Sequence, residues 1–135
     1  MAAIRRCHLL FKNILNVNNF EHLSMTANFN LVTNELIRSA IIAINGQDSR
    51  KWFELFSDDA ILSDDGSIHD FRKWSTRELF GSTACYVISI DKVEDDGRTI
   101  YCLFHSDRWG DFKTFMKFHS IGNKISRLDV GQTTY

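Results

Sequence analysis

The chain has 135 residues and contains no proline, so one common marker of an interdomain linker is missing. It has only three cysteines, Cys7, Cys85 and Cys102, whose number and spacing match neither a zinc site nor a disulfide framework. No apolar run approaches the ~20 residues that span a bilayer. Lysine and arginine are scattered and the net charge is −1, which leaves no basic patch for nucleic acid. We therefore predict a reduced, cytoplasmic protein without a membrane or nucleic-acid partner.

The residues that are present suffice for one packed domain. Apolar residues make up 44% of the chain and 11 of them are phenylalanine, so a core can form without disulfides. The first 24 residues carry basic and apolar side chains and no acid before Glu21, which faintly resembles an organelle presequence. The alternative, which we favour, is a loosely attached extension with Met25 as a candidate start. We predict an N-terminal extension over residues 1–29 and one domain over residues 30–135.

Apolar residues recur at helical spacing over residues 30–45. Asn30 or Thr33 can cap the start of this helix, and Asn45-Gly46 is typical of a left-handed stop. Its apolar stripe predicts one face packed on the core.

A second, shorter helix follows a cap at Asp48 or Ser49. We predict a short strand over Ala60–Ser63 and a turn at Asp65-Gly66. Asp70 is typical of the cap of a third helix, which we expect to end at Gly81.

After Gly81 the apolar period changes from 3.6 to 2, which predicts strands joined by short turns. The expected strands are Ala84–Val93, Thr99–Asp107, Phe112–Ser120 and Lys124–Val130. The order of elements predicts an α+β domain, with N-terminal helices gathered on one face of a curved antiparallel sheet.

Two of these strands are partly apolar on both faces. Phe112, Met116 and Phe118 share one face, whereas Phe115 shares the other with polar residues that include Lys113. Helices on one side need only one apolar face, so the second face indicates a subunit interface. We expect a homodimer through that face.

The stretch from Leu55 to Asp70, LFSDDAILSDDGSIHD, is rich in aspartate. One interpretation is that Asp58 and Asp59 bind a metal ion with Asp64, Asp65 and His69, and the hard carboxylate oxygens would suit magnesium or calcium. The stretch lacks the alternating spacing and the distal glutamate of an EF-hand loop, so we interpret Asp58-Asp59 as a solvated turn and predict no metal site.

Three segments resemble the nuclear transport factor 2-like superfamily, which includes ketosteroid isomerases, polyketide cyclases and limonene epoxide hydrolases. They are AINGQD at Ala43–Asp48, WFELFSDDAI at Trp52–Ile61 and GNKISRLD at Gly122–Asp129. The resemblance extends over about residues 31–132. It implies a cone-shaped sheet wrapped around the helices and an apolar cavity that holds a small molecule.

The resemblance to ketosteroid isomerases places the catalytic base on Asp64. Desolvation in an apolar cavity would make that carboxylate a stronger base. His69 is a candidate partner for Asp64, with a loop histidine as the alternative. The two oxyanion donors of this chemistry fall on Ala40, which has no side-chain donor, and near Thr114, which has one. This argues against ketosteroid isomerisation.

Polyketide-cyclase-like members use an acid with help from histidine, for which His105, Asp107 and Asp129 are candidates. A one-residue register error would reverse the face of each. The candidates for lining the cavity are Trp74, Tyr86, Thr114 and Phe118, and core packing explains these residues equally well.

The resulting hypothesis is a domain that binds a small hydrophobic or aromatic molecule without a cofactor. If the ligand is turned over, Asp64 would act as the acid or base, assisted by His69, His105 or Asp107, in an isomerisation, cyclisation or hydrolysis. The alternative is a non-catalytic dimerisation or interaction module whose cavity is filled by its own side chains.

Overall fold

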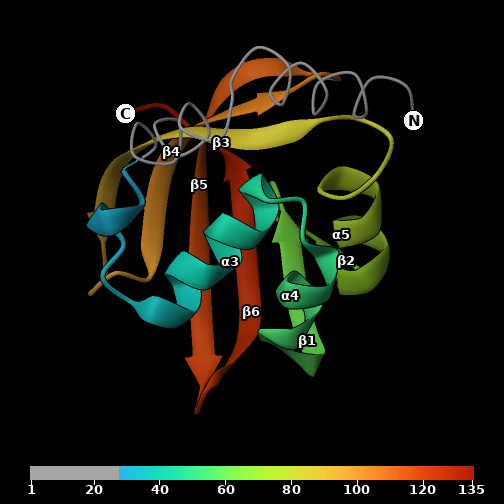
Figure 1. Ribbon diagram of the computed structural model, residues 1–135, viewed down its shortest axis with the longest axis vertical. Helices are drawn as coiled ribbons and strands as arrows, with labels where there is room; N and C mark the ends of the chain where they lie inside the picture. Colours follow the sequence, from blue (N-terminus) through green and yellow to red (C-terminus); the bar gives the residue numbers. More distant parts are fainter. Residues whose placement is uncertain (1–27) are drawn as a thin grey trace.

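The computed structural model describes residues 28–135. The extension predicted over residues 1–29, with its presequence-like segment, lies almost wholly outside the described residues. After a single turn of 3-10 helix, η1 (Phe29–Leu31), three helices lie on one face of a six-stranded sheet (Figure 1). No helix within residues 28–135 is long and apolar enough to cross a membrane.

Helix α3 (Glu35–Asn45) is amphipathic as predicted, but it begins later than expected. Its cap is Asn34, whose side-chain oxygen accepts a hydrogen bond from the backbone N–H of Ile37 at 3.1 Å. The predicted caps, Asn30 and Thr33, are wrong because η1 and a short extended link precede the helix. The buried stripe of α3 consists of Ile37, Ala40, Ile41, Ala43 and Ile44.

The end of α3 also differs from its prediction. Gly46 has right-handed backbone (φ −82°), and the left-handed residue is Gln47 (φ 52°). The Gln47 side chain donates hydrogen bonds to the carbonyl oxygens of Ile44 at 3.0 Å and Leu79 at 3.1 Å. These two bonds offset the cost of a left-handed non-glycine residue.

The two following helices are capped by aspartates as predicted. Asp48 precedes α4 (Ser49–Glu54) and Asp70 precedes α5 (Phe71–Glu78). In each case the carboxylate accepts a hydrogen bond from the backbone N–H three residues on, at 3.0 Å and 2.9 Å. Each cap satisfies one backbone N–H group at the start of its helix.

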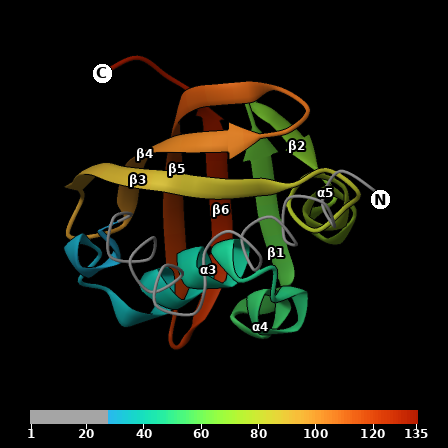
Figure 2. The same ribbon diagram turned by 45° about the horizontal axis from the view of Figure 1, so that its top comes forward.

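The sheet has the order β2-β1-β6-β5-β4-β3. All neighbours are antiparallel except β1 and β6, which are parallel. The strands are β1 (Phe56–Asp64), β2 (Ser67–His69), β3 (Cys85–Glu94), β4 (Thr99–Ser106), β5 (Gly110–Ile121) and β6 (Lys124–Gln132). Figure 2 shows β3 and β4 curling across the direction of β6 and β1, so that the sheet curves round α3. The predicted α+β class and the antiparallel meander β3 to β6 are confirmed; the parallel pair was not predicted.

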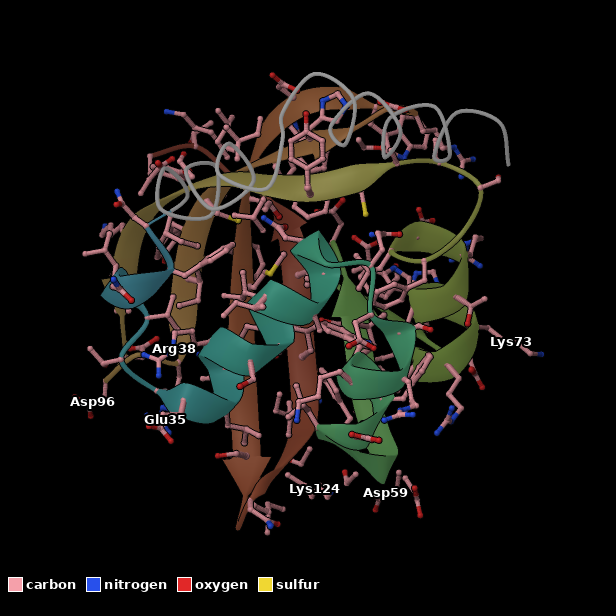
Figure 3. All side chains as sticks on the ribbon, viewed as in Figure 1. Glu35, Arg38, Asp59, Lys73, Asp96 and Lys124 are labelled. Atoms are coloured by element: carbon pink, nitrogen blue, oxygen red, sulfur yellow. The ribbon has the colours of Figure 1, made fainter. Side chains whose placement is uncertain are left out.

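Strand β1 is longer than the predicted Ala60–Ser63. Asp58 and Asp59 lie within it, so their assignment to a turn is wrong. The pairing of β1 with β6 is interrupted between Phe56 and Ile61 by a bulge, which leaves both aspartates exposed to solvent. Figure 3 shows Asp59 at the lower edge of the molecule.

The two faces of the sheet differ as predicted. The face toward the helices, here called the inner face, is buried, and the opposite outer face is half-buried and mixed in polarity. Strands β4 and β5 pair without a bulge, so alternate residues stay on their own face along the whole hairpin. Inner residues include Ile100, Cys102, Phe104, Thr114, Met116 and Phe118, and outer residues include Tyr101, Leu103, His105, Lys113, Phe115 and Lys117.

Candidate functional site

Asp64 is the last residue of β1 and lies on the inner face. It pairs with Val130 of β6, which in turn pairs with Met116, and both of these neighbours are buried. The Asp64 side chain is half-buried. The indole Nε1 of Trp74 in α5 donates a hydrogen bond to Asp64 Oδ2 at 2.9 Å. The structure therefore joins two residues that sequence analysis had singled out for separate roles.

The second carboxylate oxygen of Asp64 is open. No hydrogen bond or ion pair to Oδ1 occurs among residues 28–135. Because the described residues contain no buried side-chain nitrogen or oxygen atom without a partner, Oδ1 is in reach of solvent. The Asp64 carboxylate thus has one oxygen that already accepts a hydrogen bond and one that is free to accept another, without a cationic partner among residues 28–135.

His69 lies at the edge of the sheet, in β2. It pairs with Leu62, whereas Asp64 pairs with Ser67, and the side chain of His69 is exposed. Within residues 28–135 no hydrogen bond or ion pair links His69 to Asp64. A partnership between the two stays a prediction.

Thr114 and Phe118 of the inner face, and Ala40 of α3, lie in the core. Thr114 is 5% exposed and its Oγ1 donates to the carbonyl oxygen of Gly131 at 2.6 Å. Its only hydroxyl proton is therefore engaged within the sheet. Phe118 is 1% exposed and Ala40 is fully buried, so both pack against other side chains. This packing supplies no free hydrogen-bond donor for an oxyanion.

The remaining candidates gather on the outer face around His105. Its Nδ1 lies 2.6 Å from Asp111 Oδ1, and its Nε2 lies 2.7 Å from Asp107 Oδ1. The ring of Tyr86, which pairs with His105 across β3 and β4, lies 4.9 Å away between centroids. A neutral imidazole has only one N–H group, whereas a protonated imidazole has two. His105 can therefore donate a hydrogen bond to Asp111 and another to Asp107 at the same time only when its ring is protonated. Partial burial lowers the pKa of His105, but the bonds to Asp111 and Asp107 outweigh it and hold the pKa above its ordinary value.

Asp129 also lies on the outer face. It accepts hydrogen bonds from Ser63 Oγ at 2.5 Å and from Arg127 Nε at 3.1 Å. Burial raises the pKa of Asp129, but the bonds from Arg127 and Ser63 bring it below its ordinary value. Asp129 is therefore a charged structural partner on the face opposite to Asp64.

The candidate residues thus form two separate groups on opposite faces of the sheet. One joins Asp64 to Trp74, and the other joins His105 to Asp107 and Tyr86. No set of three histidine, cysteine, aspartate or glutamate side chains within residues 28–135 is arranged to hold a metal ion. Acid–base chemistry at Asp64 would therefore proceed without direct help from the outer-face histidine.

Sequence analysis missed Asp111 as a partner of His105. A signal existed, because the two residues are directly paired across the β4–β5 hairpin, but their pairing depends on the register of that hairpin. It also missed an open surface groove of about 680 Å³ between α4, α5 and β1, walled in part by Phe53 and Phe56. Cationic side chains at the groove already have contacts. The Lys124 ammonium donates to the Glu54 carbonyl oxygen, and the Arg72 guanidinium stacks over a phenylalanine ring.

The arrangement of strands and helices is matched by solved structures. A nuclear transport factor 2-like protein of unknown function from Cytophaga hutchinsonii aligns with a TM-score of 0.59, with 12% identity over 75% of this chain and 89% of that one. The chain has the nuclear transport factor 2-like fold. A putative polyketide cyclase from Sinorhizobium meliloti aligns at 0.57, with 16% identity over 71% of this chain and 93% of that one. A putative ketosteroid isomerase from Kribbella flavida aligns at 0.57, with 13% identity over 76% and 78%.

Comparison by sequence gives no match to this chain, either among protein-family models or among curated proteins. The structural likeness therefore establishes the fold, and the fold prediction made from three short segments is confirmed. Because this fold hosts both catalysts and non-catalysts, the function has to be argued from the site.

Proposed function

We propose that the protein binds a small apolar molecule at the Asp64 end of its inner sheet face, and that this molecule donates a hydrogen bond to Asp64 Oδ1. The observation that carries the proposal is the half-buried carboxylate with one oxygen held by Trp74 Nε1 and the other open. A carboxylate that is partly removed from water is stabilised by a further donor. The likeness to a putative polyketide cyclase and a putative ketosteroid isomerase supports a ligand-binding role.

The geometry favours a ligand with an apolar body and one hydroxyl or amine group. Asp64 is an acceptor when ionised, so a ligand with only acceptor groups would leave Oδ1 unpaired. The indole of Trp74 lies directly beside the carboxylate and is 5% exposed, so the apolar body of the ligand would pack against the small exposed part of this ring. Sterols, terpenoid alcohols and phenolic polyketides have this combination of groups.

The first experiment is a thermal-shift screen of steroid-like, terpenoid and polyketide-like compounds against the full chain. For each hit, affinity is then compared with that of its methyl ether, which lacks the donor. We expect Asp64→Asn to weaken binding of the hydroxyl compound about tenfold, because a charge-assisted hydrogen bond becomes a neutral one. The matched control is Asp59→Asn, an exposed aspartate on the same strand. Equal affinities for hydroxyl compound and ether, with no effect of Asp64→Asn, would refute the proposed site.

Turnover by Asp64 is the stronger form of this proposal. It would use the carboxylate alone to move a proton during isomerisation, cyclisation or hydrolysis of the bound ligand. Asp64→Asn would then abolish product formation even at a ligand concentration that saturates the variant. Full turnover by this variant would exclude Asp64 as the base and leave the binding role intact.

A second candidate is a dimerisation module, which the outer face supports. Tyr86, Tyr101, Leu103 and Phe115 are half-buried there, among charged side chains. We propose that two copies of the chain associate through this face, which would remove these apolar surfaces from water. Sedimentation velocity over a range of concentrations tests this proposal, and a monomer at every concentration would refute it.

A further inference from the structure

The segment that follows β6, Thr133–Tyr135, lies across the outer face and is held there at several points. Its Thr133 backbone N–H donates to the carbonyl oxygen of Lys113 at 3.0 Å. The Tyr135 hydroxyl donates to Asp91 Oδ2 at 2.7 Å. The ring of Tyr135 meets that of Tyr101 edge to face, with 5.5 Å between the centroids. We call this segment, Thr133–Tyr135, the strap.

Lys113 contacts the strap with its side chain as well. Its Nζ donates to the backbone carbonyl oxygen of Tyr135 at 2.8 Å and lies 4.6 Å from the centre of the Tyr135 ring. Asp91 belongs to β3, Tyr101 to β4 and Lys113 to β5, so one tyrosine contacts three neighbouring strands.

The contacts of the strap nevertheless all lie at the surface of the protein. Tyr135 retains 38% of its exposure, and no residue of the strap belongs to the hydrophobic core. Opening it would break hydrogen bonds that water can replace, and it would expose the outer surfaces of Tyr101 and Lys113. The segment can therefore leave the sheet without unfolding the domain.

We propose that the strap is an autoinhibitory contact that limits association of two chains through the outer face. This inference depends on the proposed dimer. In the closed position the strap covers Tyr101, an apolar residue of that face, and it engages the ammonium group of Lys113. A second copy needs the same surface, so the strap and the partner subunit compete for it. Dimers then form from the fraction of chains whose strap is open.

Competition between the strap and a partner subunit would change the dimer dissociation constant by a measurable factor. Both chains of a dimer must have an open strap, so the open fraction enters the apparent dissociation constant squared. If the strap is closed in about two-thirds of the molecules, the apparent dimer dissociation constant is about tenfold higher than that of a chain without it. Tyr135→Ala removes the hydroxyl, the ring contact and the cation–π contact together. Tyr135→Phe removes only the hydrogen bond to Asp91 and keeps the ring. Thr134→Ala is the matched control, because that side chain is exposed and makes no hydrogen bond or ion pair within residues 28–135.

The experiment is sedimentation velocity on the full chain and the three variants, with far-UV circular dichroism to verify folding. We expect the dimer dissociation constant of Y135A to fall about tenfold, that of Y135F to fall by less, and that of T134A to equal the wild-type value. If the wild type dimerises and Y135A associates equally or more weakly than the wild type, the autoinhibitory role of the strap is refuted and the proposed dimer is retained. Absence of association in all four proteins refutes the dimer and the strap together.

Discussion

The hydrogen bond from Trp74 Nε1 to Asp64 Oδ2 is expected to hold α5 against the end of β1. Trp74→Phe removes this bond and part of a side chain that is only 5% exposed. A bond to a charged acceptor contributes about 1.5 kcal/mol at the lower end of its range, which applies here because Asp64 is half-exposed. The smaller ring costs about 1 kcal/mol more. We therefore predict a loss of about 2.5 kcal/mol, which lowers Tm by about 10 °C for a domain of this size.

A double-mutant cycle separates the hydrogen bond from the packing. Asp64→Ala alone leaves the buried indole N–H unpaired, at a cost of about 1–2 kcal/mol. Once Trp74 is phenylalanine, Asp64→Ala has no such cost. The free energies of unfolding of the wild type, both single variants and the double variant are measured by urea titration, with circular dichroism as the signal because Trp74→Phe alters fluorescence.

The expected coupling free energy between the two substitutions is about 1–1.5 kcal/mol. Additivity within about 0.5 kcal/mol would show that the bond contributes nothing, and that Trp74 acts through packing alone. In that case Trp74 does not orient Asp64. The proposed ligand site would then lose its structural basis, because it depends on this hydrogen bond.

Three further outcomes are expected. Gly131→Ala places a Cβ atom 2.7 Å from Phe115 Cε1 and should lower the free energy of unfolding by about 1–3 kcal/mol in a urea titration; an unchanged midpoint would contradict this close approach. The pKa of His105 is raised in the folded state, so its protonated ring stabilises the fold at low pH through the bonds to Asp111 and Asp107. This contribution is lost as the pH rises through that pKa. The Tm difference between wild type and His105→Asn should therefore be largest below pH ~6.5 and shrink above it, and a difference that grows with pH would refute the assignment. Burial raises the pKa of the Cys85 and Cys102 thiols to about 12, so residue-resolved mass spectrometry should find both unreacted with iodoacetamide at pH 8 until urea unfolds the chain; labelling of either thiol without urea would contradict its burial.

Local chemistry explains which parts of the fold could be predicted. Asp48 and Asp70 cap helices because a short carboxylate accepts from the backbone N–H three residues on, whatever the rest of the chain does. The meander from β3 to β6 follows from a period of two and short turns such as Asp96-Gly97. Helix α3 ends at Asn45-Gly46 as predicted, but the left-handed residue is Gln47 and not Gly46, and the side chain of Gln47 contacts Leu79, far along the sequence.

The candidate site was predictable only in part. Asp64 was singled out by its position in a segment that resembles a known superfamily, and the structure places it on the inner face. Its bond to Trp74 was not predicted, because it requires α5 to fold back over the end of β1. Whether His105 stands with Asp64 was left open, since a shift of one residue moves a strand side chain to the other face.

The sequence by itself determined the three helices, the meander from β3 to β6 and the α+β class, because caps, turns and apolar periods act over a few residues. Only the tertiary structure decided which residues meet. The parallel pairing of β1 with β6 brings together residues that are more than 60 positions apart, and it places Asp64 beside Val130 on the inner face. The register of β4 and β5 places His105 with Asp111 on the outer face. Contacts between distant segments depend on the packing of the whole chain, so no local sequence pattern predicts them.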